Sequence, residues 1–186
     1  MSEVRREEHL ARRSQVITMA TNQTVTGERE EQVEIESKLR NGSLLMALAG
    51  VGFVGYGIVF LVLNFVGSGF EIGVSTLAGM TKAELDPTVA YYISHLHVAT
   101  AAFIISTGIA VTALSWYGVR QRLTRAWATA VVAAVVGLAL ALPMHYTADA
   151  FAHNWVTHLD PIDLATVVFV VGVVLAYQSL QGVEMS

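Results

Sequence analysis

The sequence contains no cysteine, and charged residues make up only 14% of its 186 positions. Without cysteine the chain forms neither disulfide bonds nor thiolate metal sites, which excludes iron–sulfur clusters. An ordinary soluble domain carries about 25% charged residues, whereas 54% of the residues here are hydrophobic. The basic residues form no stripe, so we expect no nucleic-acid partner. The shortage of charge predicts a protein that lies in a lipid bilayer.

Several catalytic motifs are also missing. The chain holds no phosphate-binding loop, Rossmann fingerprint, Gly-x-Ser-x-Gly elbow or His-Glu-x-x-His pair, and these patterns mark common soluble chemistries. Because Cys-x-x-Cys-His is absent, covalent c-type haem is excluded. No lysine lies inside an apolar run, so a retinal Schiff base is not expected. Histidine is left as the main candidate for any chemistry.

Four apolar runs are each about as long as a membrane-crossing helix, which needs about 20 residues. We predict spans at about 44–66, 91–119, 127–146 and 162–180. The predicted fold class is all-α: an integral membrane bundle of four transmembrane helices over residues 44–182. Residues 1–43 form a polar cytoplasmic tail, which we expect to be mostly disordered or helical because mixed charge at this density is usually solvated.

Small residues predict where the helices pack. Glycines crowd the first span at Gly50, Gly52, Gly55 and Gly57. A glycine in a membrane helix lets a neighbouring backbone approach closely. The lipid-facing side of the second span is predicted from Leu96, Phe103, Val111 and Leu114. Its opposite side carries the small residues Ser94, Ala101, Gly108 and Thr112. We expect a thin bundle that packs against other membrane subunits or a second copy.

Charged and aromatic residues predict how the chain enters and crosses the membrane. Of the eleven basic residues, seven precede the first span, three lie between the second and third spans, and Lys82 lies on the opposite side. The positive-inside rule therefore places both termini in the cytoplasm of a multi-pass cell-membrane protein. Asp86 followed by Pro87 predicts the start of the second helix. Aromatic residues at both ends of that span are typical of an interfacial belt.

Five of the six histidines gather near the predicted outer ends of the spans. They are His95, His97, His145, His153 and His158, with Asp149 among them. Imidazole is a common ligand for copper, zinc, iron and haem. Ionisable groups at membrane depth are costly and usually functional, although polar residues also gather at interfaces without a further role. The cluster predicts a metal or cofactor site on the outer face.

Helical spacing divides this cluster. His95 and His97 project about 200° apart on a helix, so they would share one ion only if the helix unwound. Their alternative role is to hydrogen-bond backbone carbonyls at the helix start. Asp149 and His153 share a helix face, and His145 precedes His153 by two turns. The predicted metal ligands are His145, Asp149 and His153, with His95 and His158 as further ligands.

The chain resembles one of the membrane subunits of the copper membrane monooxygenases, the ammonia- and methane-oxidising group. The resemblance rests on the order of the apolar runs, on Gln32-Val33-Glu34-Ile35, and on the segment from Trp127 through Asp149-x-x-x-His153. It implies a copper site within a membrane oxidoreductase. Gly67 and Glu71 stand where that family has the Asp and His of another copper motif, which is therefore lost. The layout is equally similar to small DoxX-like four-span proteins.

Three functions are open at this point. The first is an integral membrane subunit with an outer-face His/Asp metal site, part of a copper membrane monooxygenase or related oxidase. The second is a haem- or quinone-associated respiratory subunit, in which His97 and His145 would be the axial ligands of haem b. The third is a non-catalytic four-span protein that packs against partners through its glycine and alanine faces.

Overall fold

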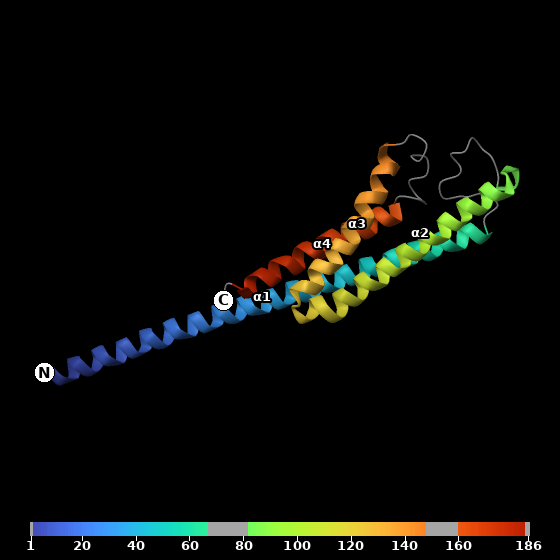
Figure 1. Cartoon of the computed structure of the whole chain (residues 1–186). Helices are drawn as coiled ribbons and strands as arrows, with labels where there is room; N and C mark the ends of the chain where they lie inside the picture. Colours follow the sequence, from blue (N-terminus) through green and yellow to red (C-terminus); the bar gives the residue numbers. More distant parts are fainter. Residues whose placement is uncertain (1, 67–81, 148–159, 185–186) are drawn as a thin grey trace.

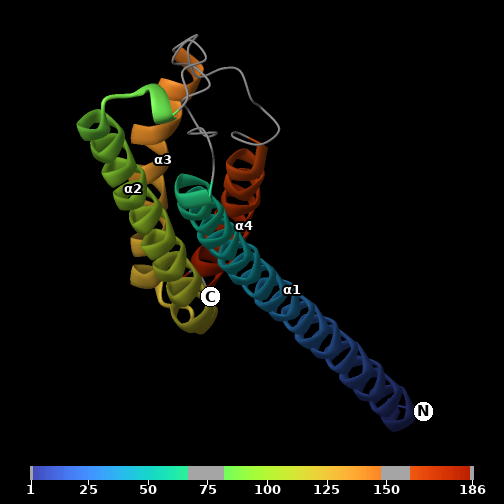
Figure 2. The same cartoon turned by 90° about the vertical axis from the view of Figure 1, so that its right-hand side faces the viewer.

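The computed structural model describes residues 2–66, 82–147 and 160–184. Its long helices are α1 (Ser2–Val66), α2 (Pro87–Ala113), α3 (Thr124–Thr147) and α4 (Asp160–Glu184). Three short turns are η1 (Lys82–Glu84), η2 (Leu114–Gly118) and η3 (Val119–Gln121). The bundle assembles on α1, because α2 and α4 both pack along its C-terminal half. The N-terminal half of α1 extends beyond the bundle (Figures 1 and 2).

Four helical stretches are long and apolar enough to cross a membrane. They are Val25–Val66, Pro87–Gln121, Thr124–Ala141 and Pro161–Gly182. The predicted all-α bundle of four membrane-spanning helices is therefore confirmed, and the protein is a multi-pass membrane protein whose apolar helices contact lipid. No β-strand occurs among the residues that the structure describes. The first two of these stretches are longer than the predicted spans, because helical hydrogen bonding continues into the polar residues that flank each apolar run.

The start of α2 confirms the predicted cap. The backbone N–H of Thr88 donates to Oδ1 of Asp86 at 2.8 Å, which satisfies one of the N–H groups that a helix leaves without a partner at its first turn. Pro87 occupies the first helical position, where its missing N–H costs nothing. At its other end α2 continues into the π-helical turn η2 and the 3-10 turn η3.

A seam of small residues, spaced seven apart, joins α1 to the antiparallel α2. On α1 these are Gly50, Gly57 and Asn64, and level with them on α2 are Gly108, Ala101 and Ser94. A Cβ atom added to Gly108 would lie 2.6 Å from the carbonyl oxygen of Gly50, and one added to Gly50 would lie 2.8 Å from that of Gly108. The two backbones therefore touch directly, as close-packed membrane helices do.

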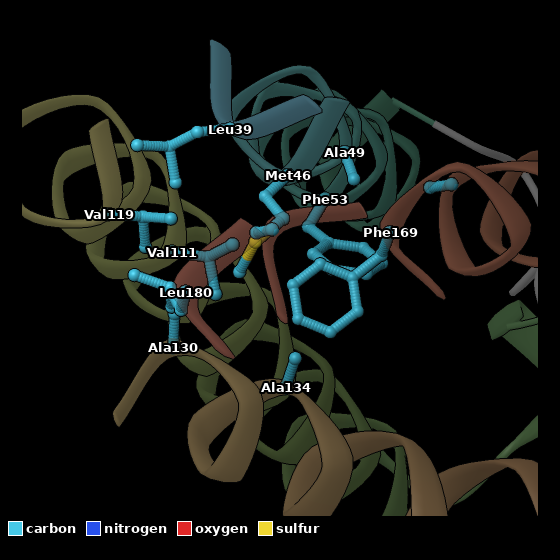
Figure 3. Packing of buried hydrophobic residues seen from close by; sticks show 12 residues of the cluster. Leu39, Met46, Ala49, Phe53, Val111, Val119, Ala130, Ala134, Phe169 and Leu180 are labelled. Atoms are coloured by element: carbon cyan, nitrogen blue, oxygen red, sulfur yellow. The ribbon is translucent and has the colours of Figure 1, made fainter. Parts of the chain in front are cut away.

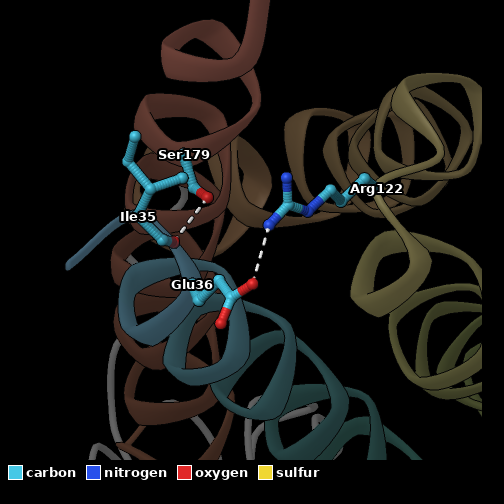
Figure 4. Close-up of polar contacts among 4 residues, drawn as sticks. All are labelled: Ile35, Glu36, Arg122 and Ser179. Atoms are coloured by element: carbon cyan, nitrogen blue, oxygen red, sulfur yellow. Dashed lines mark hydrogen bonds and ion pairs between the residues drawn. The ribbon is translucent and has the colours of Figure 1, made fainter. Parts of the chain in front are cut away.

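A second seam joins α1 to α4. A Cβ atom added to Gly42 would lie 2.9 Å from the carbonyl oxygen of Gly172, and the reverse distance is also 2.9 Å. Seven residues from this contact, the Ser179 hydroxyl donates to the carbonyl oxygen of Ile35 at 2.7 Å (Figure 4). Thus α1 presents one strip of small residues to α2 and another to α4.

Larger side chains fill the space between the two seams. Phe53 of α1 and Phe169 of α4 lie with ring centroids 6.4 Å apart, and Val111 of α2 belongs to the same core (Figure 3). Val111 is fully buried, so its assignment to the lipid-facing side is wrong. Phe103 is exposed as predicted. Val111 is buried because it shares this core with residues of the other three helices, such as Met46, Ala130 and Leu180 (Figure 3).

The bundle begins within the predicted tail. α1 is continuous across residue 43, and Leu39 is 5% exposed and part of the core. Together with the hydrogen bond accepted by Ile35, this places the last two turns of the polar tail against α4 and the turn between α2 and α3. Neighbouring helices bury these positions. The apolar run that predicts the first span begins after them, so it does not reveal this packing.

Candidate functional site

The predicted ligands that the structure describes lie at one end of the bundle, here called the histidine end (Figure 1). His95 and His97 are on α2, and His145 is in the last turns of α3. Asp149, His153 and His158 lie outside the described residues. Among the residues that are described, no three His, Cys, Asp or Glu side chains form a metal-binding group. The metal site built on His145, Asp149 and His153 therefore stays a prediction.

The two histidines of α2 have different surroundings. His97 is half-buried, and its ring meets the ring of Phe60 edge-on, with centroids 5.1 Å apart and an interplanar angle of 75°. His95 is exposed. α2 is regular between them, so the predicted divergence of the two imidazoles holds. Of these two, His97 is the histidine that contributes to the interior of the bundle.

A buried amide, that of Asn64, contacts α2 one turn before His97. Asn64, in the last turn of α1, is 5% exposed and donates from Nδ2 to Oγ of Ser94 at 2.8 Å. A polar side chain at membrane depth is retained only with a hydrogen-bonding partner, because its desolvation is costly. Asn64 is absent from the sequence-based candidates. The sequence does contain a pattern that points to Asn64, since it lies seven residues beyond Gly57 in the series that forms the α1–α2 seam.

A cleft of about 550 Å³ opens between α2 and α3. The two helices meet near the turn that joins them, and α3 diverges from α2 towards the histidine end (Figure 1). The lining is mainly apolar, including Phe53, Ile104 and Leu138, and its polar members among the described residues are Thr100 and Thr107. Gly137 adds open space, because a Cβ atom there would meet no described atom within 4 Å.

His97 precedes the part of α2 that lines this cleft and packs on Phe60 of α1. Positions 97, 100, 104 and 107 are separated by three, four and three residues, the spacing of one helix face. The last three of these line the cleft, so His97 stands one turn beyond it. On α3, position 145 continues the series 134, 138 and 141 by one further turn. Positions 97 and 145 therefore each stand one helical turn from residues that line the cleft.

The opposite end of the bundle, here called the arginine end, carries the α2–α3 turn. Arg122 lies in this turn, and its Nη2 is 3.4 Å from Oε1 of Glu36 on α1 (Figure 4). Sequence reasoning used the arginines only to orient the chain. Their contact with α1 depends on the antiparallel packing of α1 and α2, which brings residues 86 positions apart together.

Comparison of this chain with protein-family models, with curated proteins and with solved structures finds no match. The fold and the described side chains define a class, a four-span all-α membrane protein with an apolar cleft between two of its helices. The resemblance to a membrane subunit of the copper monooxygenases and to DoxX-like proteins stays a prediction.

Proposed function

We propose that the protein is an integral membrane subunit that binds a lipophilic, carbonyl-bearing ligand of the quinone class between α2 and α3. The observation that carries the proposal is the cleft of about 550 Å³, whose apolar wall includes Thr100 and Thr107. Ligand pockets usually measure about 300–1,000 Å³ and combine an apolar lining with a few polar groups that orient the ligand. The cleft has this composition.

The position of the cleft favours a ligand that arrives through the lipid. Its lining residues belong to the membrane-spanning parts of all four helices, and a strongly polar ligand would lose its hydration there. Threonine hydroxyls donate hydrogen bonds that suit a carbonyl oxygen. The imidazole of His97 supplies a further hydrogen-bonding group one turn before Thr100 on α2. Together these residues suit a ring with polar oxygens and an apolar tail.

The test compares cleft variants with neighbours on the other side of the same helix. Full-length protein is purified in a mild detergent, and its organic extract is analysed by chromatography with absorbance and mass detection. Thr107→Leu, which fills the cleft, and His97→Ala should each reduce the amount of co-purifying quinone at least severalfold. Ser106→Leu and His95→Ala are the controls, because Ser106 and His95 are exposed. A wild-type preparation without any quinone contradicts the proposal.

A second candidate is the outer-face metal site, with His145, Asp149 and His153 as ligands and copper as the metal. The observation in its favour is that α3 is helical through Thr147, because the proposed spacing requires His145 to lie on a helix. A copper site would support the resemblance to copper membrane monooxygenases. Elemental analysis of the purified protein tests it, and finding neither copper, zinc nor iron contradicts it. A Soret band in the same sample would instead indicate haem b.

We further propose that the protein lies in the cell membrane with both termini in the cytoplasm. The support is that the arginine end combines the α2–α3 turn with the C-terminal end of α4 and the polar part of α1 (Figure 1). Basic loops stay preferentially on the cytoplasmic side. Other membrane subunits or a second copy are proposed neighbours, because many large apolar side chains are exposed on α3 and α4. Mass spectrometry of co-purifying chains tests this part.

A further inference from the structure

The arginine end contains a second cleft, between α1 and the α2–α3 turn. Its volume is about 450 Å³, and its lining includes Glu36, Ser37, Leu39, Arg40, Arg120 and Arg122. Antiparallel packing of α1 on α2 brings Arg40 to the same cleft as the two arginines of the turn. The site is distinct from the quinone cleft, which lies near the histidine end.

The charges of this second cleft are unbalanced. Three guanidinium groups face one carboxylate, which leaves a formal excess of two positive charges. The Arg122–Glu36 contact is 3.4 Å long and both side chains are exposed, so this pair is weak. Lys38 is occupied elsewhere, because its Nζ lies 2.7 Å from Oε1 of Glu34. Each guanidinium presents five N–H donors in a planar fork that matches a phosphate group.

The turn holds the arginines in fixed positions. Arg122 has a left-handed backbone, with φ of 64°, and its N–H donates to the carbonyl oxygen of Val119 at 2.8 Å. The N–H of Leu123 donates to the carbonyl oxygen of Gly118 at 3.1 Å. The guanidinium of Arg120 lies over the Trp116 ring, 4.6 Å from its centroid, and this cation–π contact restrains it further.

Aromatic residues place the second cleft at the depth of the lipid headgroups. Trp116 and Tyr117 end the second span, and Trp127 stacks on Tyr177 with centroids 5.2 Å apart. Tryptophan and tyrosine concentrate where the hydrocarbon meets the headgroups. All four belong to the arginine end, and three of them, Trp116, Tyr117 and Trp127, are close in sequence to the arginines of the turn. The cleft therefore lies where a phospholipid phosphate would be, with the apolar side chain of Leu39 in its wall.

We propose that this cleft binds the phosphate group of an anionic phospholipid. Phosphate can accept hydrogen bonds from more than one guanidinium, which makes the interaction stronger than a single exposed ion pair. Anionic lipids are abundant in the cytoplasmic leaflet, and an arginine that contacts the lipid headgroup adds roughly fivefold to affinity. The carboxylate of Glu36 repels the phosphate, so it should lower the affinity for the lipid.

Native mass spectrometry of the full-length protein in an uncharged detergent tests the proposal. The protein is titrated with dioleoylphosphatidylglycerol, dioleoylphosphatidylcholine or inorganic phosphate, and the dissociation constant is obtained for each. We expect phosphatidylglycerol to bind tightest. Arg40→Gln and Arg122→Gln should each weaken its binding roughly fivefold, and Glu36→Gln should strengthen it. Arg125→Gln is the matched control, because Arg125 is exposed in the same region but does not line the cleft.

Folding and lipid binding are separated by two further measurements. The thermal midpoint of each lipid-free variant shows whether it folds, and Arg40→Lys and Arg122→Lys retain the charge and should retain most of the binding. Equal phosphatidylglycerol affinity in Arg40→Gln, Arg122→Gln and Arg125→Gln would overturn the proposal. So would inorganic phosphate binding as tightly as phosphatidylglycerol, since the cleft would then be a site for a soluble anion.

Discussion

Asn64 and Ser94 connect the last turn of α1 to the second turn of α2 through a hydrogen bond of 2.8 Å from Nδ2 to Oγ. This contact lies at one end of a seam in which the same pairing recurs every seven residues, through Gly57 with Ala101 and Gly50 with Gly108. The hydrogen bond and the glycine contacts therefore specify a single antiparallel register for α1 and α2.

The Asn64–Ser94 bond should contribute measurably to stability. Hydrogen bonds between membrane helices are worth about 0.6 kcal/mol on average and up to about 1.7 kcal/mol. We expect Asn64→Ala to lower the free energy of unfolding by about 1 kcal/mol, within that range. Unfolding in mixed micelles with increasing denaturing detergent measures it. A double-mutant cycle with Ser94→Ala isolates the pair, and a coupling energy of zero would show that the bond contributes nothing.

Gly108 should tolerate no side chain. Its added Cβ would lie 2.6 Å from the carbonyl oxygen of Gly50, so Gly108→Ala must push α2 away from α1. We expect a loss of about 1–3 kcal/mol, as for other overpacked interiors. Gly55→Ala is the matched control on α1, because its added Cβ meets no described atom within 4 Å. The same unfolding assay applies, and equal effects of the two changes would contradict the direct backbone contact.

Phe169 should be a main support of the core between the seams. It is 2% exposed and packs against Phe53. Phe169→Ala removes these contacts and leaves a cavity, and comparable changes cost about 3–5 kcal/mol. Its neighbour Val170 is 53% exposed, so Val170→Ala should change the unfolding free energy by less than about 0.5 kcal/mol. Thermal unfolding followed by circular dichroism distinguishes the two variants.

The absence of cysteine makes the proposed orientation directly testable. Single substitutions Ala83→Cys, before α2, and Gln121→Cys, in the α2–α3 turn, place one thiol at each end of the bundle without background labelling. In intact cells a membrane-impermeant maleimide should label Ala83→Cys and leave Gln121→Cys unmodified. After permeabilisation both should react. Labelling of Gln121→Cys alone in intact cells would show that the termini lie outside.

The candidate site could be anticipated only in part. The spacing of His95 and His97 correctly predicted that they diverge, because helix geometry depends on sequence separation alone. The cleft between α2 and α3 was not anticipated, because it arises from the divergence of two helix axes. Asn64 was missed although its spacing of seven residues from Gly57 is visible in the sequence, because only the packing shows that its partner is Ser94.

The sequence by itself determined the number of membrane-spanning helices, their approximate limits and the Asp86 cap. These features depend on local quantities, namely the length of an apolar run and the hydrogen-bonding needs of a helix terminus. Only the tertiary structure decided which helix is central, the register of both seams, and the burial of Val111 and Leu39. These depend on pairwise packing between distant segments. In a membrane every helix face is apolar enough for lipid, so hydrophobicity alone does not tell a buried face from an exposed one.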